Sequence, residues 1–205
     1  MGGRAMTAAR AAAVAAVLVS GPGWAGVQDG TADAVSGHLD AGARAYRRGD
    51  ITVAARELQA AVMDLQQRLG RDLAAAMPPV PAGWQVDDPE VEGLGSVGGG
   101  LSVTRAYTRD DSSLNVSIIL DSPAVGAAAA LMANPTAQPN LKRVKVGAED
   151  ALLRWDAAAR SGEITLVVAS RVLLQIEGDG LPGDDALVDL ARGFDVAALR
   201  KLLAA

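Results

Sequence analysis

The spacing of apolar residues changes from a helical to a strand period at a group of three prolines, and this change constrains the fold most strongly. Before residue 78, apolar residues recur every three or four positions, which is typical of amphipathic helices. After Trp84 they alternate with polar residues, which is typical of half-buried strands. Because proline cannot continue a helix, the prolines mark a boundary. The chain is expected to join a helical hairpin, residues 26–77, to an α+β domain, residues 84–205, through a proline-rich linker at 78–83.

Two helices are expected before the linker, each with one apolar face. The members are Val35, Leu39, Gly42 and Tyr46 in the first helix and Ile51, Ala55, Leu58, Val62, Leu65 and Leu69 in the second. Gly49 ends the first helix, and Asp50 is suited to cap the second. Gly42 lowers intrinsic helix stability but permits close approach of a neighbouring helix. The pattern predicts a hairpin held by small-residue contacts.

Antiparallel hairpins are expected after the linker. The predicted pairs are Leu101–Tyr107 with Leu114–Leu120, Val144–Val146 with Ala151–Trp155, and Ile164–Val168 with Val172–Ile176 across a turn at Ala169-Ser170. A short helix is expected between Ser122-Pro123 and Asn134-Pro135, and a final helical region should bury Leu187, Leu190, Ala191 and Phe194. The expected fold is α+β, with about six antiparallel strands and helices on one side.

The segment HLDAGARAYRRGDITVAARELQAA, residues 38–61, resembles a single tetratricopeptide-type unit. Its glycines and packing residues fall where that repeat places them, at Gly42, Gly49, Ala54, Leu58 and Ala61. The match departs at His38, where the repeat has a large aromatic. A solenoid needs about three repeats to be stable, and the sequence has no second copy. The resemblance implies a protein-contact surface. An ordinary helical hairpin is the alternative.

A second resemblance covers roughly residues 78–203. The runs PAGW, DSSLNVSIILDSP, ANP and EITLVVASRVLLQIEG are similar to those of a group of exported bacterial proteins of uncharacterised function. The order of hairpin, short helix, two hairpins and terminal helix is similar to the PsbP-like sandwich fold. Proteins with that fold mostly act as assembly or binding factors, so the resemblance implies a noncatalytic role and transfers no site residues.

The first 25 residues have the features of a cleaved secretory signal peptide. Arg4 and Arg10 precede an apolar run, and small residues at Gly23 and Ala25 fit the positions read by signal peptidase. The run spans about ten residues, half of the roughly 20 that cross a bilayer. We expect a periplasmic or secreted protein without membrane insertion after cleavage; a retained anchor is the alternative. The sequence has no cysteine, which excludes lipoprotein attachment.

Charge and composition exclude several functional classes. The chain has a net charge of −5, and loss of two leader arginines would leave −7. Because a negative chain without a basic stripe is repelled by phosphate, we expect no nucleic-acid partner. The absence of cysteine removes disulfides, thiolate metal sites and thiol nucleophiles. Few aromatics remain after the leader, so stacking platforms for sugars or single strands are not expected.

No motif in the sequence forms a coherent catalytic or metal site. The run GLGSVG, residues 93–98, matches a dinucleotide-binding fingerprint, but a strand rather than a helix is expected after it. His38 is the single histidine and has no suitable nucleophile beside it. The acidic groups at residues 87–92 and 177–185 lack EF-hand spacing and are expected to be solvated. No catalytic residue, cofactor or metal is predicted.

Two functional hypotheses remain after these exclusions. The first is an exported, noncatalytic protein that binds a protein partner or stabilises an assembly through its hairpin. The second is a small-ligand-binding module, or a hydrolase using carboxylates, with a cleft between the sheet and the terminal helices. The cleft candidates are Trp84, Arg105, Tyr107 and Arg154. Each also has a structural explanation: Trp84 and Tyr107 as core residues, and the arginines as strand-face charges.

Overall fold

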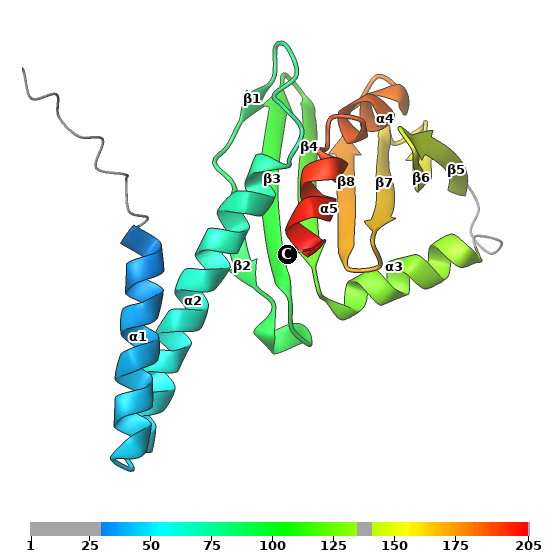
Figure 1. The fold of residues 1–205 in the computed structure, drawn as a ribbon. Coiled ribbons are helices and arrows are strands. Elements are labelled where there is room, and N and C mark those ends of the chain that lie inside the picture. The colour runs from blue at the N-terminus through cyan, green and yellow to red at the C-terminus, as the bar shows by residue number, and fades with distance from the viewer. Residues whose placement is uncertain (1–29, 135–140, 205) are drawn as a thin grey trace, which may run out of the picture.

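The computed structural model describes residues 30–134 and 141–204, which form an antiparallel sheet with helices on both faces and a helical hairpin at one edge (Figure 1). The predicted signal peptide, residues 1–25, lies outside the described residues. No helix within the described ranges has the length and apolarity needed to cross a membrane. The expected α+β class is confirmed, as is the helical hairpin before the sheet.

The elements follow the predicted order. The helices are α1 (Gly30–Arg47), α2 (Ile51–Ala75), α3 (Pro123–Ala133), α4 (Asp185–Ala191) and α5 (Val196–Ala204), with a 3₁₀ turn η1 at Gly95–Val97. The strands are β1 (Gln85–Val86), β2 (Glu90–Gly93), β3 (Leu101–Arg109), β4 (Ser112–Leu120), β5 (Leu141–Val146), β6 (Glu149–Asp156), β7 (Ser161–Val168) and β8 (Val172–Asp179).

The strands of the described residues form one antiparallel sheet in the order β1-β3-β4-β8-β7-β6-β5, and β2 also pairs with β3. The three predicted hairpins are present as β3–β4, β5–β6 and β7–β8. The sheet has eight strands where about six were expected, because β1 and β2 both lie along the outer edge of β3. Both are short, and the β2 side chains are exposed, so neither has the alternation that reveals a half-buried strand.

The main core fills one face of the sheet. It is covered by α4, α5 and the end of α2, and its buried members include Leu187, Leu190, Ala191 and Phe194, as expected. The expectation that helices lie on one side is wrong, because α3 covers the opposite face. Val125 of α3 is buried, together with Leu152 and Leu173 from the sheet. The doublets Leu152-Leu153 and Leu173-Leu174 place an apolar residue on each face, and a second helix layer shields the outer ones.

The hairpin packs through small residues, as the sequence indicates. Ala45, Ala54 and Ala61 are buried, and a Cβ on Gly42 would lie 3.1 Å from Cγ of Leu58. Asp50 occupies the N-cap position of α2, as predicted, but its side chain makes no capping hydrogen bond in the described structure.

The end of α2 is part of the sheet's core. Leu73, Ala74, Ala76 and Met77 are buried in the same cluster as the strand residues. The backbone N–H of Asp195 donates to the carbonyl of Ala76 at 3.0 Å, which ties the helix end to the terminal helices. Figure 1 shows α2 running from the sheet outward past its edge, with α1 folded back along the protruding part.

The β7–β8 turn lies at Ala169-Ser170, as predicted, and both residues have left-handed backbone angles, with φ of 52° and 56°. Left-handed angles cost non-glycine residues about 1–2 kcal/mol each, and Asn-Gly is preferred in such turns. We therefore expect the double substitution Ala169→Asn/Ser170→Gly to raise the free energy of unfolding by about 1 kcal/mol. Urea denaturation measures this, and an unchanged midpoint would show that the turn is not strained.

Candidate functional site

The four sequence-predicted cleft residues lie in three separate places. Arg105 lines a large pocket between α2, β2 and β3. Trp84 lines a smaller hollow between the proline-rich linker, residues 78–83, and α4. Tyr107 is buried, and Arg154 lies on the opposite face of the sheet. The structure does not bring these residues together in one cleft.

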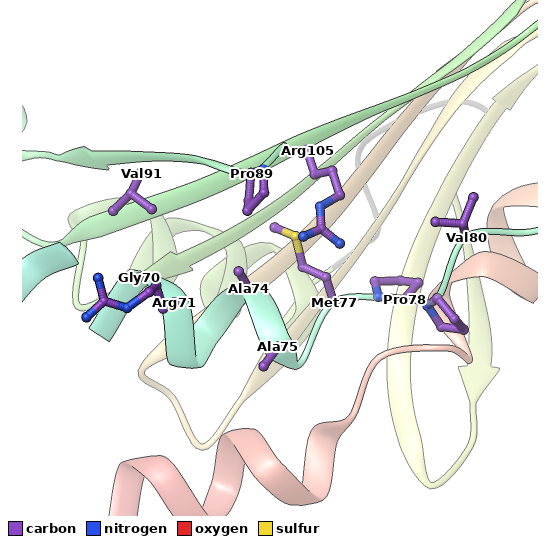
Figure 2. Close-up of a pocket in the computed structure, with 11 residues that line it drawn as sticks. Gly70, Arg71, Ala74, Ala75, Met77, Pro78, Val80, Pro89, Val91 and Arg105 are labelled. Carbon is purple, nitrogen blue, oxygen red and sulfur yellow. The ribbon is translucent and has the colours of Figure 1, made fainter. Parts of the chain in front are cut away.

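The pocket at Arg105 has a volume of about 690 Å³. Its lining is mostly apolar and comes from the end of α2, the proline segment and the β2 edge (Figure 2). Arg105 extends from β3 toward Met77 on the far side of the pocket, while Arg71 lies at one end beside Gly70. No acidic residue is among the described residues that line it. The pocket therefore combines an apolar wall with guanidinium groups and no internal counter-charge.

Trp84 and Arg109 form a second hollow of about 340 Å³ between the prolines and α4. The Arg109 guanidinium carbon lies 4.7 Å from the Trp84 ring centroid, within cation–π range. Trp84 is partly buried against the main core. This hollow is the one nearest to the predicted cleft between sheet and terminal helices, but of the four candidates only Trp84 lines it.

Tyr107 and Arg154 have structural roles. Tyr107 is completely buried, and its hydroxyl donates to the carbonyl of Pro78 at 2.9 Å. Burial raises the pKa of this hydroxyl, and the neighbouring Arg105 guanidinium opposes the rise. Arg154 pairs with Glu163 across β6 and β7 at a small hollow beneath α3. Tyr107 therefore anchors the linker to the sheet, and Arg154 is a paired charge on the α3 face.

Sequence reasoning missed the residues that complete the Arg105 pocket. Met77, Pro89 and Val91 all line it. Met77 follows the end of α2, and Pro89 and Val91 belong to the short β2 edge and the loop before it, which have no alternation that would reveal their place beside β3. One signal was available, because Arg105 falls in phase with the buried Val103 and Tyr107. A charge in phase with core residues indicates an arginine that faces inward.

A second candidate surface lies on the hairpin. The hairpin face is the set of large apolar side chains Leu39, Tyr46, Ile51, Leu58, Val62 and Leu65, which are 45–68% exposed. These residues belong to the two predicted apolar faces. The stripe on α2 continues through Leu69 and Leu73, which pack into the main core. The same side of α2 is thus buried where it lies over the sheet and exposed where it extends beyond the sheet.

The other side of the hairpin seam is polar. Nδ1 of His38 lies 2.8 Å from a carboxylate oxygen of Glu57, and its Nε2 lies 3.9 Å from one of Asp64. The hydrogen bond from His38, with a smaller effect of Arg56, lowers the pKa of Glu57. On the helical wheel these polar residues and the hairpin face lie on opposite sides of the contact between α1 and α2. His38 is therefore a structural hairpin residue.

The substitution His38→Ala should raise the pKa of Glu57 toward its ordinary value of about 4.3, because it removes the largest cause of the shift. A carboxyl with a lowered pKa stabilises the fold above the ordinary value, and that contribution is lost as the pH falls through the folded-state pKa. Carbon-detected NMR titration of Glu57 measures the change. Asp150, whose pKa is lowered by Lys145, is the control and should titrate unchanged. A fixed Glu57 pKa would contradict the assigned cause.

The glycine-rich run and the acidic residues near it also have clear positions in the fold. The run at residues 93–98 is followed by strand β3, as expected, so it lacks the helix that dinucleotide binding needs. Asp87, Asp88, Glu90 and Glu92 are all exposed around β2. Within the described part of the chain, no three His, Asp or Glu side chains gather as a metal would require.

No protein-family model matches the chain, and no curated protein or solved structure is significantly similar to it. The fold and surfaces define an α+β protein with a protruding helical hairpin and a mostly apolar pocket lined by two arginines, Arg71 and Arg105. Its function is inferred from these two features.

Proposed function

We propose that the protein is a noncatalytic binding protein of the bacterial periplasm whose hairpin face binds another protein. The observation that carries the proposal is the exposure of six large apolar side chains on one side of the hairpin. Half-exposed side chains of this size leave on the order of 500 Å² of apolar surface, at the upper end of what monomers show in one patch. Such patches commonly mark protein contacts, and a stable interface needs about 800 Å² per partner.

The proposed occupant is an amphipathic helix with an aliphatic stripe. From Ile51 to Leu65 the face extends about 21 Å along α2, at 1.5 Å per residue, which matches four turns of a docked helix. The face itself contains no charged residue, and Ala55 and Gln59 border it on α2. A surface without charges at its centre selects an uncharged, apolar contact. Recognition in which an amphipathic helix lays its apolar face along an apolar helical surface, as in coiled-coil zippers, fits these features.

The export signal and the fold class also support the proposed binding role. The leader has the charge, length and small residues of a signal peptide, which is the basis for the proposed export. We also propose that the sheet domain is a PsbP-like sandwich, a class in which binding and assembly roles prevail. The tetratricopeptide-like character of residues 38–61 supports a contact role for the hairpin, since such units serve as protein-binding surfaces.

Photo-crosslinking in cells tests the proposal. A photoreactive amino acid is placed at Tyr46 or Val62 on the hairpin face, and at Gln67 as the control. Gln67 is exposed on the same helix but points away from the face. The leader is retained so that the chain reaches its own compartment. We expect the same partner at Tyr46 and Val62, crosslinked through an amphipathic helical segment, and no such product at Gln67.

Three outcomes would contradict the proposal. These are the absence of crosslinks at both face positions, equal crosslinking at Gln67, and crosslinks that join two copies of this chain. Determining the N-terminus of the purified product tests export in the same cells. Residue 26 is expected at the start of the mature chain, and an uncleaved leader would contradict that part.

A further inference from the structure

The side chain of Arg105 is half-buried and begins on the core face of its strand. It lies on the core face of β3, between Val103 and Tyr107, and its register partner on β4 is Val116. All three neighbours are completely buried. The Nε atom of Arg105 is itself buried and has no hydrogen-bond partner among the described residues. The residue as a whole is half-buried and its guanidinium neighbours the Tyr107 hydroxyl. Because buried N–H groups normally have an acceptor, the buried Nε would be satisfied by an oxygen from a bound ligand.

The space beside Arg105 is large enough to hold that anion together with an apolar body. The pocket's volume of about 690 Å³ falls within the 300–1,000 Å³ range of small-molecule sites. Its apolar walls are formed by Ala74, Met77, Pro78, Val80, Pro89 and Val91. Figure 2 shows these side chains on both sides of the hollow that Arg105 enters from β3.

The charges around the pocket restrict the ligand further. A guanidinium group recognises a carboxylate with two parallel hydrogen bonds. The lining residue Pro89 lies between Asp88 and Glu90 in sequence, and both acids are outside the pocket lining. Their negative charge disfavours a ligand with several negative charges at that rim. The second guanidinium in the lining, that of Arg71, lies at the other end of the pocket beside Gly70 and belongs to an exposed residue. A single carboxylate at Arg105 therefore fits the half-buried part of the pocket.

We propose that this pocket binds an aliphatic monocarboxylate, with the carboxylate at Arg105 and the alkyl chain along the wall formed by α2 and β2. The inference does not depend on the hairpin face, because the pocket and the face use different residues. It goes beyond the proposed function by giving the sheet domain its own small-molecule site. Arg105 is the specificity residue, and the apolar wall supplies most of the contact area.

Isothermal titration calorimetry of the full mature chain with sodium octanoate tests the site, with 1-octanol as the uncharged probe of equal chain length. We expect saturable octanoate binding and at least tenfold weaker octanol binding. Arg105→Met should reduce octanoate affinity at least tenfold and leave octanol affinity within twofold. Arg109→Met is the matched control on the same strand outside the pocket, and it should leave both affinities unchanged.

A second variant covers the case in which Arg105→Met fails to fold. Val91→Trp fills the pocket from its partly exposed rim and should abolish binding of both probes. Amide chemical shifts should move at Met77 and Val91 when octanoate is added. Three results would overturn the proposal: no saturable octanoate binding, equal affinity in Arg105→Met, or tighter binding of an apolar acetylated tripeptide with a free C-terminal carboxylate than of octanoate.

Discussion

Gly180→Ala should lower the free energy of unfolding by about 3 kcal/mol. Gly180 follows β8 with φ of +67°, and a Cβ there would lie 2.3 Å from the backbone carbonyl oxygen of Asp111. The added methyl group therefore meets the rigid β3–β4 turn while the backbone adopts angles that alanine disfavours. The same backbone accepts a hydrogen bond from the Ser112 hydroxyl at 2.8 Å, so any shift also weakens this contact.

Gly147→Ala separates the cost of the left-handed backbone angle from the cost of the steric contact. Gly147 has a similar φ of +62°, but no described heavy atom outside its immediate neighbours lies within 4 Å of the position that a Cβ would take. Only the backbone cost applies there, and a loss of about 1 kcal/mol is expected. Urea unfolding followed by tryptophan fluorescence measures both variants. Equal losses in the two would show that the close approach of Gly180 to Asp111 contributes nothing to stability.

Leu73→Ala should destabilise the whole protein by about 2–5 kcal/mol. Leu73 lies near the end of α2 and is completely buried in the cluster that includes the strands. Its truncation leaves a cavity beneath the helix, and partial relaxation of the surroundings cannot fill it. We expect helix and sheet signals to be lost in one shifted transition, because α2 and the sheet share this core.

Leu65→Ala is the matched control on the same helix. Leu65 is 48% exposed, so its truncation should reduce stability by less than about 1 kcal/mol. Similar losses in the two variants would contradict the shared core. If the core is shared, removal of residues 26–77 would strip buried side chains from the sheet, so point substitutions on the hairpin are the sound way to test its function.

Strand alternation explains why the three hairpins could be predicted. Leu114, Val116, Ile118 and Leu120 alternate with polar or less buried positions and form the core face of β4. β2 could not be predicted in this way, because Val91 is flanked by glutamates and packs against Gly70 of α2 rather than within a sheet face. β2 is held by antiparallel pairing with β3 on one side and by this long-range contact with α2.

For the candidate sites too, periodicity alone does not reveal which elements pack together. The phase of Arg105 in its strand was visible in the sequence, but the pocket depends on where α2, the prolines and β2 meet. The hairpin face was visible as two apolar stripes. Its exposure was not, because periodicity reveals which side chains share a face and leaves open what covers them. Only the position of α2 relative to the sheet shows that Leu73 is covered and Val62 is exposed.

The central claim is that the hairpin face binds an amphipathic helix, and a binding measurement with matched variants tests it most directly. The partner segment identified by crosslinking is synthesised and titrated into wild type, Val62→Asp and Met63→Asp. Val62 and Met63 are 51% and 54% exposed, but only Val62 belongs to the hairpin face. We predict at least a tenfold loss of affinity for Val62→Asp and a change within threefold for Met63→Asp. Equal affinities in the two variants would contradict the claim.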